Sequence, residues 1–241
     1  MKIILSKIKE NILDILFPKF CLNCGKEKDY LCQDCFSLID ILERQYCPFC
    51  HSQNIVVDGK TCNFCKRTKT LNGLYCAVSY SDNIIKKLIN QFKYQPYIKE
   101  LSKLLSHLIL IHFIKLNKSL DFKEFIIIPI PLHKKKIKQR GFNQANEIGK
   151  ELSKSLKIPI YNDILIKIKE TPPQMELKKD QRKENIKQVF SCQNQEKITN
   201  KKILLIDDVF TTGSTMEECA FVLKQSKAKQ IWGVAIARGQ N

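Results

Sequence analysis

Two adjacent carboxylates and a cluster of hydroxyl side chains stand close together near the carboxyl-terminal end of the 241-residue chain. Asp207 and Asp208 directly follow the mostly apolar run 202–206, which predicts a buried strand. A few positions later, small hydroxyl residues surround a glycine in the segment Thr211-Thr212-Gly213-Ser214-Thr215, where a helix is expected to begin. N–H groups at a helix N-terminus point toward an anion, and glycine lets the backbone approach it closely. Because carboxylates accept hydrogen bonds from sugar hydroxyls, we predict a phosphate cradle beside a site for a vicinal diol.

Cysteines supply a second chemistry, since eight of the eleven form four Cys-x-x-Cys pairs before residue 66. The pairs are Cys21 with Cys24, Cys32 with Cys35, Cys47 with Cys50, and Cys62 with Cys65. Each pair places two thiolates on one side of a turn, and two pairs complete a tetrahedral zinc site. We expect two structural zinc ions bound by consecutive pairs. Interleaved pairing, a redox role and an iron–sulfur cluster are the alternatives.

The segment 47–51 also matches the Cys-x-x-Cys-His pattern of haem attachment. Haem attachment requires export, whereas the segment 1–19 predicts an amphipathic helix interrupted by charges rather than an export signal. The three other cysteine pairs also have no histidine beside them. We therefore interpret His51 as a surface residue. We expect a cytoplasmic protein with reduced thiols and no membrane insertion.

The net charge of +17 is high, and most of it follows the cysteine pairs. The first 70 residues hold 11 Lys and Arg against 8 Asp and Glu, whereas the rest of the chain holds 30 against 16. One interpretation is a solvated basic surface in a lysine-rich composition. The other is attraction to polyanions such as nucleic acid or phosphorylated ligands. Five basic residues crowd into one predicted loop: Lys134, Lys135, Lys136, Lys138 and Arg140.

Beyond residue 70 the chain alternates predicted strands with predicted helices. The strands are expected at 74–80, 125–130, 164–168, 202–206 and 231–237, and the helices at 84–92, 98–116, 143–156 and from about 214. This alternation predicts an α/β fold with a doubly wound, mostly parallel sheet that binds ligands at the carboxyl ends of its strands. We therefore expect three parts: a helix at 1–19, a double zinc-binding module at 20–70, and the α/β domain at 71–241.

The segment 205–215 resembles the signature with which type I phosphoribosyltransferases bind 5-phosphoribosyl 1-pyrophosphate (PRPP). Two further segments are similar to those of the ComF family of competence-associated proteins, which includes ComFC and GntX relatives. They are the block Arg140-Gly141-Phe142-Asn143-Gln144-Ala145 and the stretch that begins Thr171-Pro172-Pro173-Gln174. The double cysteine module fits the same family, so the resemblance covers nearly the whole chain. Two arginine positions of the family are occupied by Lys136 and Lys169, which keep the charge but lose the bidentate fork.

This resemblance implies roles for individual residues. The ribose hydroxyls would be held by Asp207 and Asp208. The 5′-phosphate would be held by Val209, Thr211, Thr212, Gly213, Ser214 and Thr215. The pyrophosphate loop would comprise Pro131, Leu132, His133 and Lys134, together with Arg140. A mobile hood that excludes water would include Thr171, Gln174 and Arg182.

The resemblance implies an enzyme that displaces pyrophosphate from C1 of PRPP with Mg²⁺, and the sequence does not name the acceptor. Two other functions stay open. One is a non-catalytic protein that handles single-stranded DNA during DNA uptake and natural transformation, with a competence helicase or DNA-processing proteins as partners. The high charge and interspersed aromatics such as Phe92, Tyr94 and Tyr97 are compatible with strand binding. The other is a regulator that senses PRPP. Turnover of PRPP separates the enzyme from both alternatives.

Overall fold

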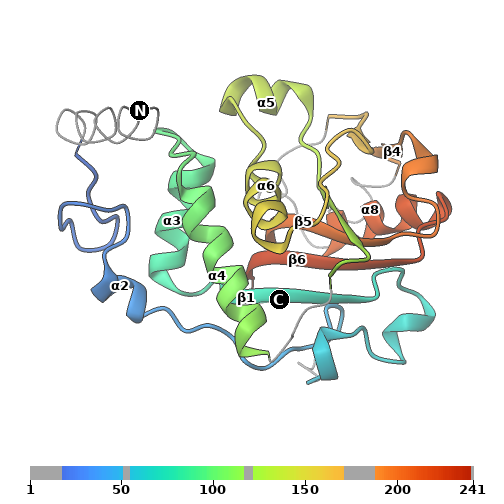
Figure 1. Cartoon of the computed structure of the whole chain (residues 1–241), viewed down its shortest axis with the longest axis horizontal. Helices are drawn as coiled ribbons and strands as arrows, with labels where there is room; N and C mark the ends of the chain where they lie inside the picture. The colour runs from blue at the N-terminus through green and yellow to red at the C-terminus, as the bar shows by residue number, and fades with distance from the viewer. Residues whose placement is uncertain (1–17, 51–54, 117–121, 171–187, 240–241) are drawn as a thin grey trace.

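A four-stranded parallel sheet forms the centre of the molecule (Figure 1). The computed structural model describes residues 18–50, 55–116, 122–170 and 188–239. Across the sheet the strands follow the order β1 (Gly73–Ser79), β6 (Gln230–Arg238), β5 (Lys202–Phe210) and β2 (Phe125–Pro129). All three neighbouring pairs are parallel. The carboxyl ends of the strands therefore meet at one edge of the sheet, as the α/β prediction requires.

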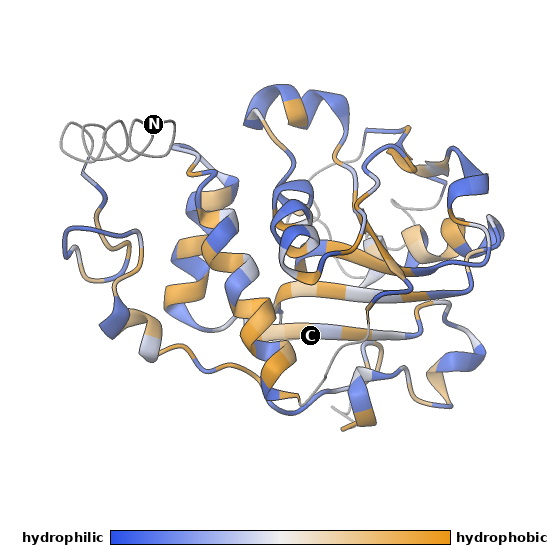
Figure 2. Cartoon of the chain, in the orientation of Figure 1, coloured by the Kyte–Doolittle hydropathy of each residue, from blue (hydrophilic) through white to orange (hydrophobic). Residues whose placement is uncertain are grey.

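Helices cover both faces of this sheet, which confirms the doubly wound architecture. On one face lie α4 (Leu101–Lys115) and α6 (Gln144–Leu156), with α3 (Asn83–Lys93) packed beside α4. On the other face lie α8 (Ser214–Gln225) and the antiparallel pair β3 (Leu165–Lys167) and β4 (Phe190–Cys192). The strands and the inward helix faces carry the apolar residues (Figure 2). Burial of these apolar surfaces between the layers is the main force that holds the domain together.

Local signals in the sequence explain where the helices begin and end. The Asp82 carboxylate accepts hydrogen bonds from the N–H groups of Ile84 and Ile85 and so caps α3. Asn143 caps α6 in the same way, because its Oδ1 accepts from the Ala145 N–H. Both capping residues precede an amphipathic run, so each helix begins within a residue of its predicted start.

Two expectations about the sheet and its loops were wrong. The basic segment predicted as a loop is a short helix, α5 (Lys134–Arg140). His133 caps it, and Gly141 ends it at a φ of 77°. The intervening Lys, Gln and Arg residues are good helix formers, which explains the difference. The strand predicted at 164–168 does not join the main sheet but pairs with β4 in a separate two-stranded sheet.

The cysteine-rich segment covers the outer edge of β1. It contains the short helices α2 (Gln33–Ser37), η1 (Val57–Gly59) and η2 (Cys65–Arg67). Isolated bridges join Ile41 to Val78 and Lys60 to Gly73, so this segment shields an otherwise open sheet edge. The helix predicted at 1–19 falls almost wholly outside the described residues. Among the helices that the structure describes, none combines the length and apolar character that a bilayer span needs.

Candidate functional site

The two adjacent carboxylates lie near the carboxyl end of β5, between the neighbouring strands β6 and β2. The strand continues past both of them to Phe210, so Asp207 and Asp208 point to opposite faces of the sheet. Asp208 faces the α3 side and is buried, whereas Asp207 faces the α8 side and is half-buried. The Asp207 carboxylate also accepts a hydrogen bond of 2.8 Å from the Asp208 N–H. Each acid therefore has its own surroundings, which the sequence did not indicate.

Asp208 forms a close ion pair with Lys93, the last residue of α3. Its Oδ1 lies 2.7 Å from the lysine Nζ, and the two side chains are only 12% and 20% exposed. Burial on its own would lower the pKa of Lys93, but attraction to Asp208 outweighs burial and leaves the pKa raised. Lys93 is therefore a permanent cation beside this acid. Sequence reasoning missed it, because nothing local to residue 93 indicates a partner 115 positions away.

The electrostatic surroundings of Asp207 differ from those of Asp208. Burial raises the pKa of Asp207 to about 7, the negative charge of Asp208 adds to the effect, and Lys93 and Lys167 oppose it. Lys167, on β3, has a lowered pKa because it is half-buried and because Lys136 of α5 repels it. Lys93 of α3 and Lys167 of β3 thus act electrostatically on Asp207, and Lys136 of α5 acts on Lys167. Lys93 and Lys167 lower the pKa of Asp207, but burial and the charge of Asp208 outweigh them.

The hydroxyl-rich turn connects β5 to α8. Gly213 has a φ of 75° and directly precedes the helix, so the chain turns sharply at a conformation that side chains disfavour. Thr212 Oγ1 and Ser214 Oγ lie 2.9 Å apart, and the Ser214 N–H donates to Thr212 Oγ1. A small cavity of about 30 Å³ lies between this turn, Asp207 and the start of α8. Here the first N–H groups of a twelve-residue helix meet two hydroxyls, as a phosphate cradle requires.

The second cysteine cluster packs directly against this turn. The Phe49 ring lies 6.4 Å from the Phe210 ring, edge to face, and a Cβ at Gly213 would collide with the Phe210 ring at 2.4 Å and lie 3.2 Å from the Phe49 ring. Arg238, at the end of β6, donates hydrogen bonds of 3.2 and 2.9 Å to the carbonyl oxygens of Tyr46 and Cys47. The cysteine module therefore packs against the turn at Thr211–Thr215, which we call the phosphate turn after its predicted ligand.

The segment after β2 reaches the same edge of the sheet. The Ile130 N–H donates to the Ile206 carbonyl, so the predicted pyrophosphate loop at 131–134 begins beside β5. Asn143 donates to the Ile130 carbonyl at 2.9 Å, and the buried Gln144 donates to the Phe92 carbonyl at 3.1 Å. These two residues of the Arg-Gly-Phe-Asn-Gln-Ala block thus tie α6 to the loop and to the end of α3. The side-chain amides of Asn143 and Gln144 therefore bind backbone carbonyl groups.

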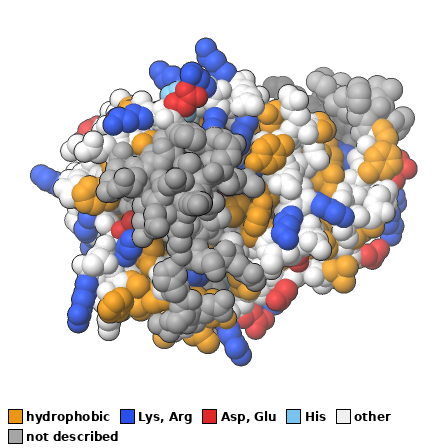
Figure 3. Space-filling view, turned by 180° about the vertical axis from the view of Figure 1, so that it is seen from behind, with side chains coloured by type: hydrophobic (Ala, Val, Ile, Leu, Met, Phe, Trp, Pro, Cys, Tyr) orange, Lys and Arg blue, Asp and Glu red, His pale blue; other side chains and the backbone are white. Residues whose placement is uncertain are grey.

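Helix α5 presents Lys134, Lys135 and Lys138 to solvent above this edge. Lys and Arg side chains gather at the upper edge of the molecule in Figure 3, where α5 lies in Figure 1. Lys135 pairs with Glu170 on the neighbouring chain segment. Arg140 donates 3.1 Å to the Gln144 side chain, and its guanidinium lies 5.8 Å from the centre of the Tyr94 ring. The predicted hood residues Thr171, Gln174 and Arg182 lie outside the described residues.

The eight cysteines form two clusters of four, each made of consecutive pairs. One comprises Cys21, Cys24, Cys32 and Cys35, and the other Cys47, Cys50, Cys62 and Cys65. Within each cluster the Sγ atoms all lie within 4.8 Å of one another, and three of the Sγ–Sγ distances are 3.5 to 3.6 Å. These are far longer than a disulfide bond and close to the ~3.8 Å edge of a zinc–sulfur tetrahedron with ~2.3 Å bonds.

Hydrogen bonds to sulfur also fit zinc thiolates. Asn23 Nδ2 donates to Cys35 Sγ at 3.3 Å, and the Cys62 N–H donates to Cys47 Sγ at 3.4 Å. Such donors stabilise the negative charge of metal-bound sulfur. Gly25, just after Cys24, has a φ of 79°, which agrees with a tight turn around a metal. Both clusters thus have the donor set, spacing and surroundings of structural zinc sites.

Comparison with known proteins agrees with this arrangement. A phosphoribosyl transferase domain family matches residues 114–240, and a double zinc ribbon domain matches residues 12–66. Competence protein F of Haemophilus influenzae is 29% identical over 90% of this chain and 96% of its own length. Competence protein ComFC of Bacillus subtilis is 26% identical over 88% of this chain and 86% of its own. DNA utilization protein YhgH of Escherichia coli K12 is 28% identical over 60% of this chain and 64% of its own.

Among solved structures, an allosteric regulatory enzyme of purine biosynthesis matches 57% of this chain and 24% of its own, at 16% identity and a TM-score of 0.34. That likeness is too distant to bear on the site. The family match, in contrast, covers more than half of the chain and includes the carboxylate pair and the phosphate turn. The chain therefore belongs to the phosphoribosyl transferase domain family and, with its double zinc ribbon and its relatives, to the ComF type within it.

Proposed function

We propose that this protein binds PRPP at the carboxyl end of β5 and transfers its phosphoribosyl group to an acceptor. The observation that carries the proposal is the junction of Asp207 with the Thr212–Ser214 turn and the N-terminus of α8, with Asp208 next to it on the other face of β5. The turn would bind the 5′-phosphate through backbone N–H groups and hydroxyls. The carboxylates would accept hydrogen bonds from the ribose hydroxyls.

In the proposed reaction, the bond from C1 of the ribose to pyrophosphate breaks and a bond from C1 to the nucleophile forms. Positive charge develops on the ribose as pyrophosphate leaves, and the two carboxylates stabilise it at short range. Hard carboxylate oxygens also suit Mg²⁺, which when bound would neutralise charge on the pyrophosphate. Asp207 and Asp208 are the described residues nearest to that role, with ligand oxygens and water completing the shell.

For Asp208 to accept a hydrogen bond from the ribose, its ion pair with Lys93 must open at least in part. In the proposed complex Lys93 keeps the acid charged and oriented until the ligand arrives, and afterwards balances it from the protein side. The basic residues after β2 would receive the pyrophosphate, with Lys134 and Arg140 the members given that role by the family pattern. The hood residues Thr171, Gln174 and Arg182 belong to the same proposal.

We further propose a role in handling incoming DNA, since relatives over most of the chain are named competence proteins. Eight reduced thiols in metal clusters suit a cytoplasmic location. A specific observation also favours the second candidate function, direct binding of single-stranded DNA. Helix α5 exposes Lys134, Lys135 and Lys138 at the same edge as the phosphate turn. Contacts between these lysines and phosphates would make strand binding strongly salt-dependent.

Isothermal calorimetry tests the PRPP site. PRPP with Mg²⁺ should bind the wild type, and Asp207→Asn combined with Asp208→Asn should abolish binding while the zinc content is unchanged. Glu196→Gln, an exposed acid on η4 (Gln195–Lys197), is the control and should bind normally. Unchanged PRPP affinity in the double variant would refute the assignment.

Turnover is tested separately by measuring pyrophosphate release from PRPP with bases and with oligonucleotide ends as acceptors. Binding without release for any acceptor would favour the PRPP-sensing or DNA-handling alternatives. Replacing Lys134, Lys135 and Lys136 by alanine should flatten the salt dependence of oligonucleotide binding. If it does not, α5 is not the DNA-binding surface.

A further inference from the structure

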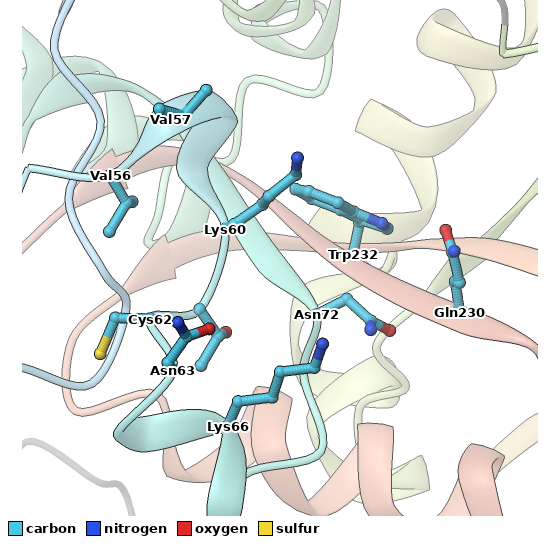
Figure 4. A pocket seen from close by; sticks show the side chains of 10 residues that line it. Val56, Val57, Lys60, Cys62, Asn63, Lys66, Asn72, Gln230 and Trp232 are labelled. Carbon is cyan, nitrogen blue, oxygen red and sulfur yellow. The ribbon is translucent and has the colours of Figure 1, made fainter.

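A second pocket, of about 520 Å³ (Figure 4), lies at the amino ends of the strands, whereas the phosphate turn lies at their carboxyl ends. It forms between the Val56–Lys66 part of the second zinc ribbon and the amino ends of β1 and β6. The strands are parallel, and Trp232 lies six positions before Arg238, which stands beside the turn. At about 3.3 Å per residue this places the pocket roughly 20 Å from the proposed PRPP site. The pocket therefore belongs to neither the carboxylate pair nor the phosphate turn.

An immobilised indole forms one wall of this pocket. The Trp232 ring stacks on the Tyr75 ring with centroids 5.3 Å apart and planes 14° apart. Gly73, directly opposite Trp232 on β1, allows this position, because a side chain there would come within 2.3 Å of the indole. The ring is half-buried, and its remaining surface lines the pocket. A fixed aromatic surface beside open space is suited to stacking with a planar ring.

Carboxamide groups lie next to the indole. Asn72 Oδ1 accepts a 2.7 Å hydrogen bond from the Ile231 N–H, which orients that side chain and leaves its NH₂ as the group directed away from this bond. Figure 4 shows Asn72 beside Trp232, with Gln230 near the end of the indole that carries nitrogen. Amides and an indole N–H offer both donors and an acceptor to the edge of a ligand ring.

Two lysines give the pocket a positive charge. Lys60 and Lys66 are both exposed and approach it from different sides (Figure 4). No Asp or Glu is among the described residues that line the pocket, although Asp58 lies 3.9 Å from Lys60 and Cys62, a thiolate of the second cysteine cluster, lies in the pocket wall. Purely apolar ligands would gain nothing from the lysines, and a bare phosphate would gain nothing from the indole. The combination fits a ligand with a planar aromatic ring and an anionic group.

We propose that this pocket binds a nucleotide, with the base on Trp232 and the phosphate between Lys60 and Lys66. Its volume is within the range of about 300–1,000 Å³ that small-ligand sites occupy. The inference does not depend on PRPP chemistry at the other edge. Its ligand is either a free nucleotide or one unit of a single strand, which share this chemistry and which the experiment separates.

Trp232 is the sole tryptophan of the chain, so intrinsic fluorescence reports on this pocket directly. Titration with dAMP should quench the emission, and adenosine or ribose 5-phosphate should quench it much more weakly. Lys66→Ala should weaken dAMP binding about fivefold, the effect of one exposed charge contact. Lys103→Ala removes the same charge from an exposed position on α4 and should change nothing. Calorimetry with Trp232→Phe should show a loss of at least about fivefold, as expected for a weakened stacking platform.

A nucleotide would also be the product at the proposed PRPP site when the acceptor is a base, so the two sites must be told apart. Quenching by dAMP should persist in the Asp207→Asn and Asp208→Asn double variant and in excess PRPP. Quenching that disappears in either case would overturn the proposal, as would ribose 5-phosphate binding as well as dAMP. Absence of quenching by both dAMP and a short deoxythymidine oligonucleotide would overturn it as well. Tighter binding of the oligonucleotide than of dAMP would identify a strand as the natural ligand, and the reverse order a free nucleotide.

Discussion

Replacing Lys93 by methionine should leave Asp208 as an unpaired and nearly buried carboxylate at the end of β5. The two charges lie 2.7 Å apart in side chains that are 20% and 12% exposed. At an effective dielectric constant of about 20 their attraction is about 6 kcal/mol, and much of it offsets the cost of removing both charges from water. Loss of one partner of a buried pair costs about 3–5 kcal/mol. Because this pair keeps some contact with solvent, we expect the lower value, about 3 kcal/mol.

Thermal and urea unfolding near neutral pH measure this loss. For a chain of this size, about 3 kcal/mol corresponds to a melting temperature lowered by about 6–12 °C. Lys86→Met is the matched control, because Lys86 is a half-buried lysine on the same helix α3. It should change the melting temperature far less than Lys93→Met does.

A double-mutant cycle with Asp208→Asn isolates the pair itself. The combined variant should be more stable than the sum of the two single changes predicts, by at least about 1.5 kcal/mol, because the second change removes the charge that the first left unpaired. A coupling energy below about 0.5 kcal/mol would refute our account of the site's electrostatics. So would equal destabilisation by Lys93→Met and Lys86→Met.

Three further predictions concern the same edge of the sheet. The pKa of Asp207 is raised from 3.8 to about 7 in the folded protein, so its contribution to stability is fully present below pH 3.8 and is lost as the pH rises through 7. Asp207→Asn should therefore be close to the wild type near pH 4 and exceed its stability by about 4 kcal/mol at pH 8, the free energy that a rise in pKa from 3.8 to about 7 corresponds to, as urea unfolding at several pH values will show. Gly213→Ala should destabilise the protein by about 2 kcal/mol in the same assay, because its φ of 75° is strained for alanine and its methyl group would meet the Phe210 ring at 2.4 Å. Phe49→Ala should weaken PRPP binding about fivefold in calorimetry without loss of zinc, since it removes an aromatic contact from the phosphate turn. Unchanged affinity would mean that the contact between Phe49 and Phe210 has no effect on ligand binding.

The strand, turn and helix around Thr211–Thr215 and the cysteine clusters could be predicted from the sequence because they are local. Thr211 to Thr215 are consecutive, and a strand before them and a helix after them follow from hydrophobic periodicity. Each Cys-x-x-Cys turn likewise brings two sulfurs together without help from distant residues. Pairing of consecutive turns needs only short connecting segments, and the structure has this pairing.

The charges around the carboxylates could not be predicted in the same way. Lys93 and Lys167 lie on α3 and β3, and only the packing of the layers brings them to Asp208 and Asp207. The opposite orientation of the two acids follows from the extension of β5 to Phe210, which strand propensity alone does not indicate. Helix α5 was missed because seven residues are too few for a hydrophobic period to be visible.

The second zinc ribbon packs against the phosphate turn and the strands and helix beside it. Glu217, in the first turn of α8, accepts hydrogen bonds from the backbone N–H groups of Thr70 and Leu71, which directly follow the ribbon. With the Arg238 contacts to the ribbon backbone and the Phe49 contact to the turn, three separate interactions hold this module against β6, β5 and α8. A closed four-sulfur zinc site is rigid and has no open position for chemistry. We therefore infer that its metal acts on function indirectly, since a loss of zinc from this cluster would release the wall against which Gly213 and the start of α8 are packed.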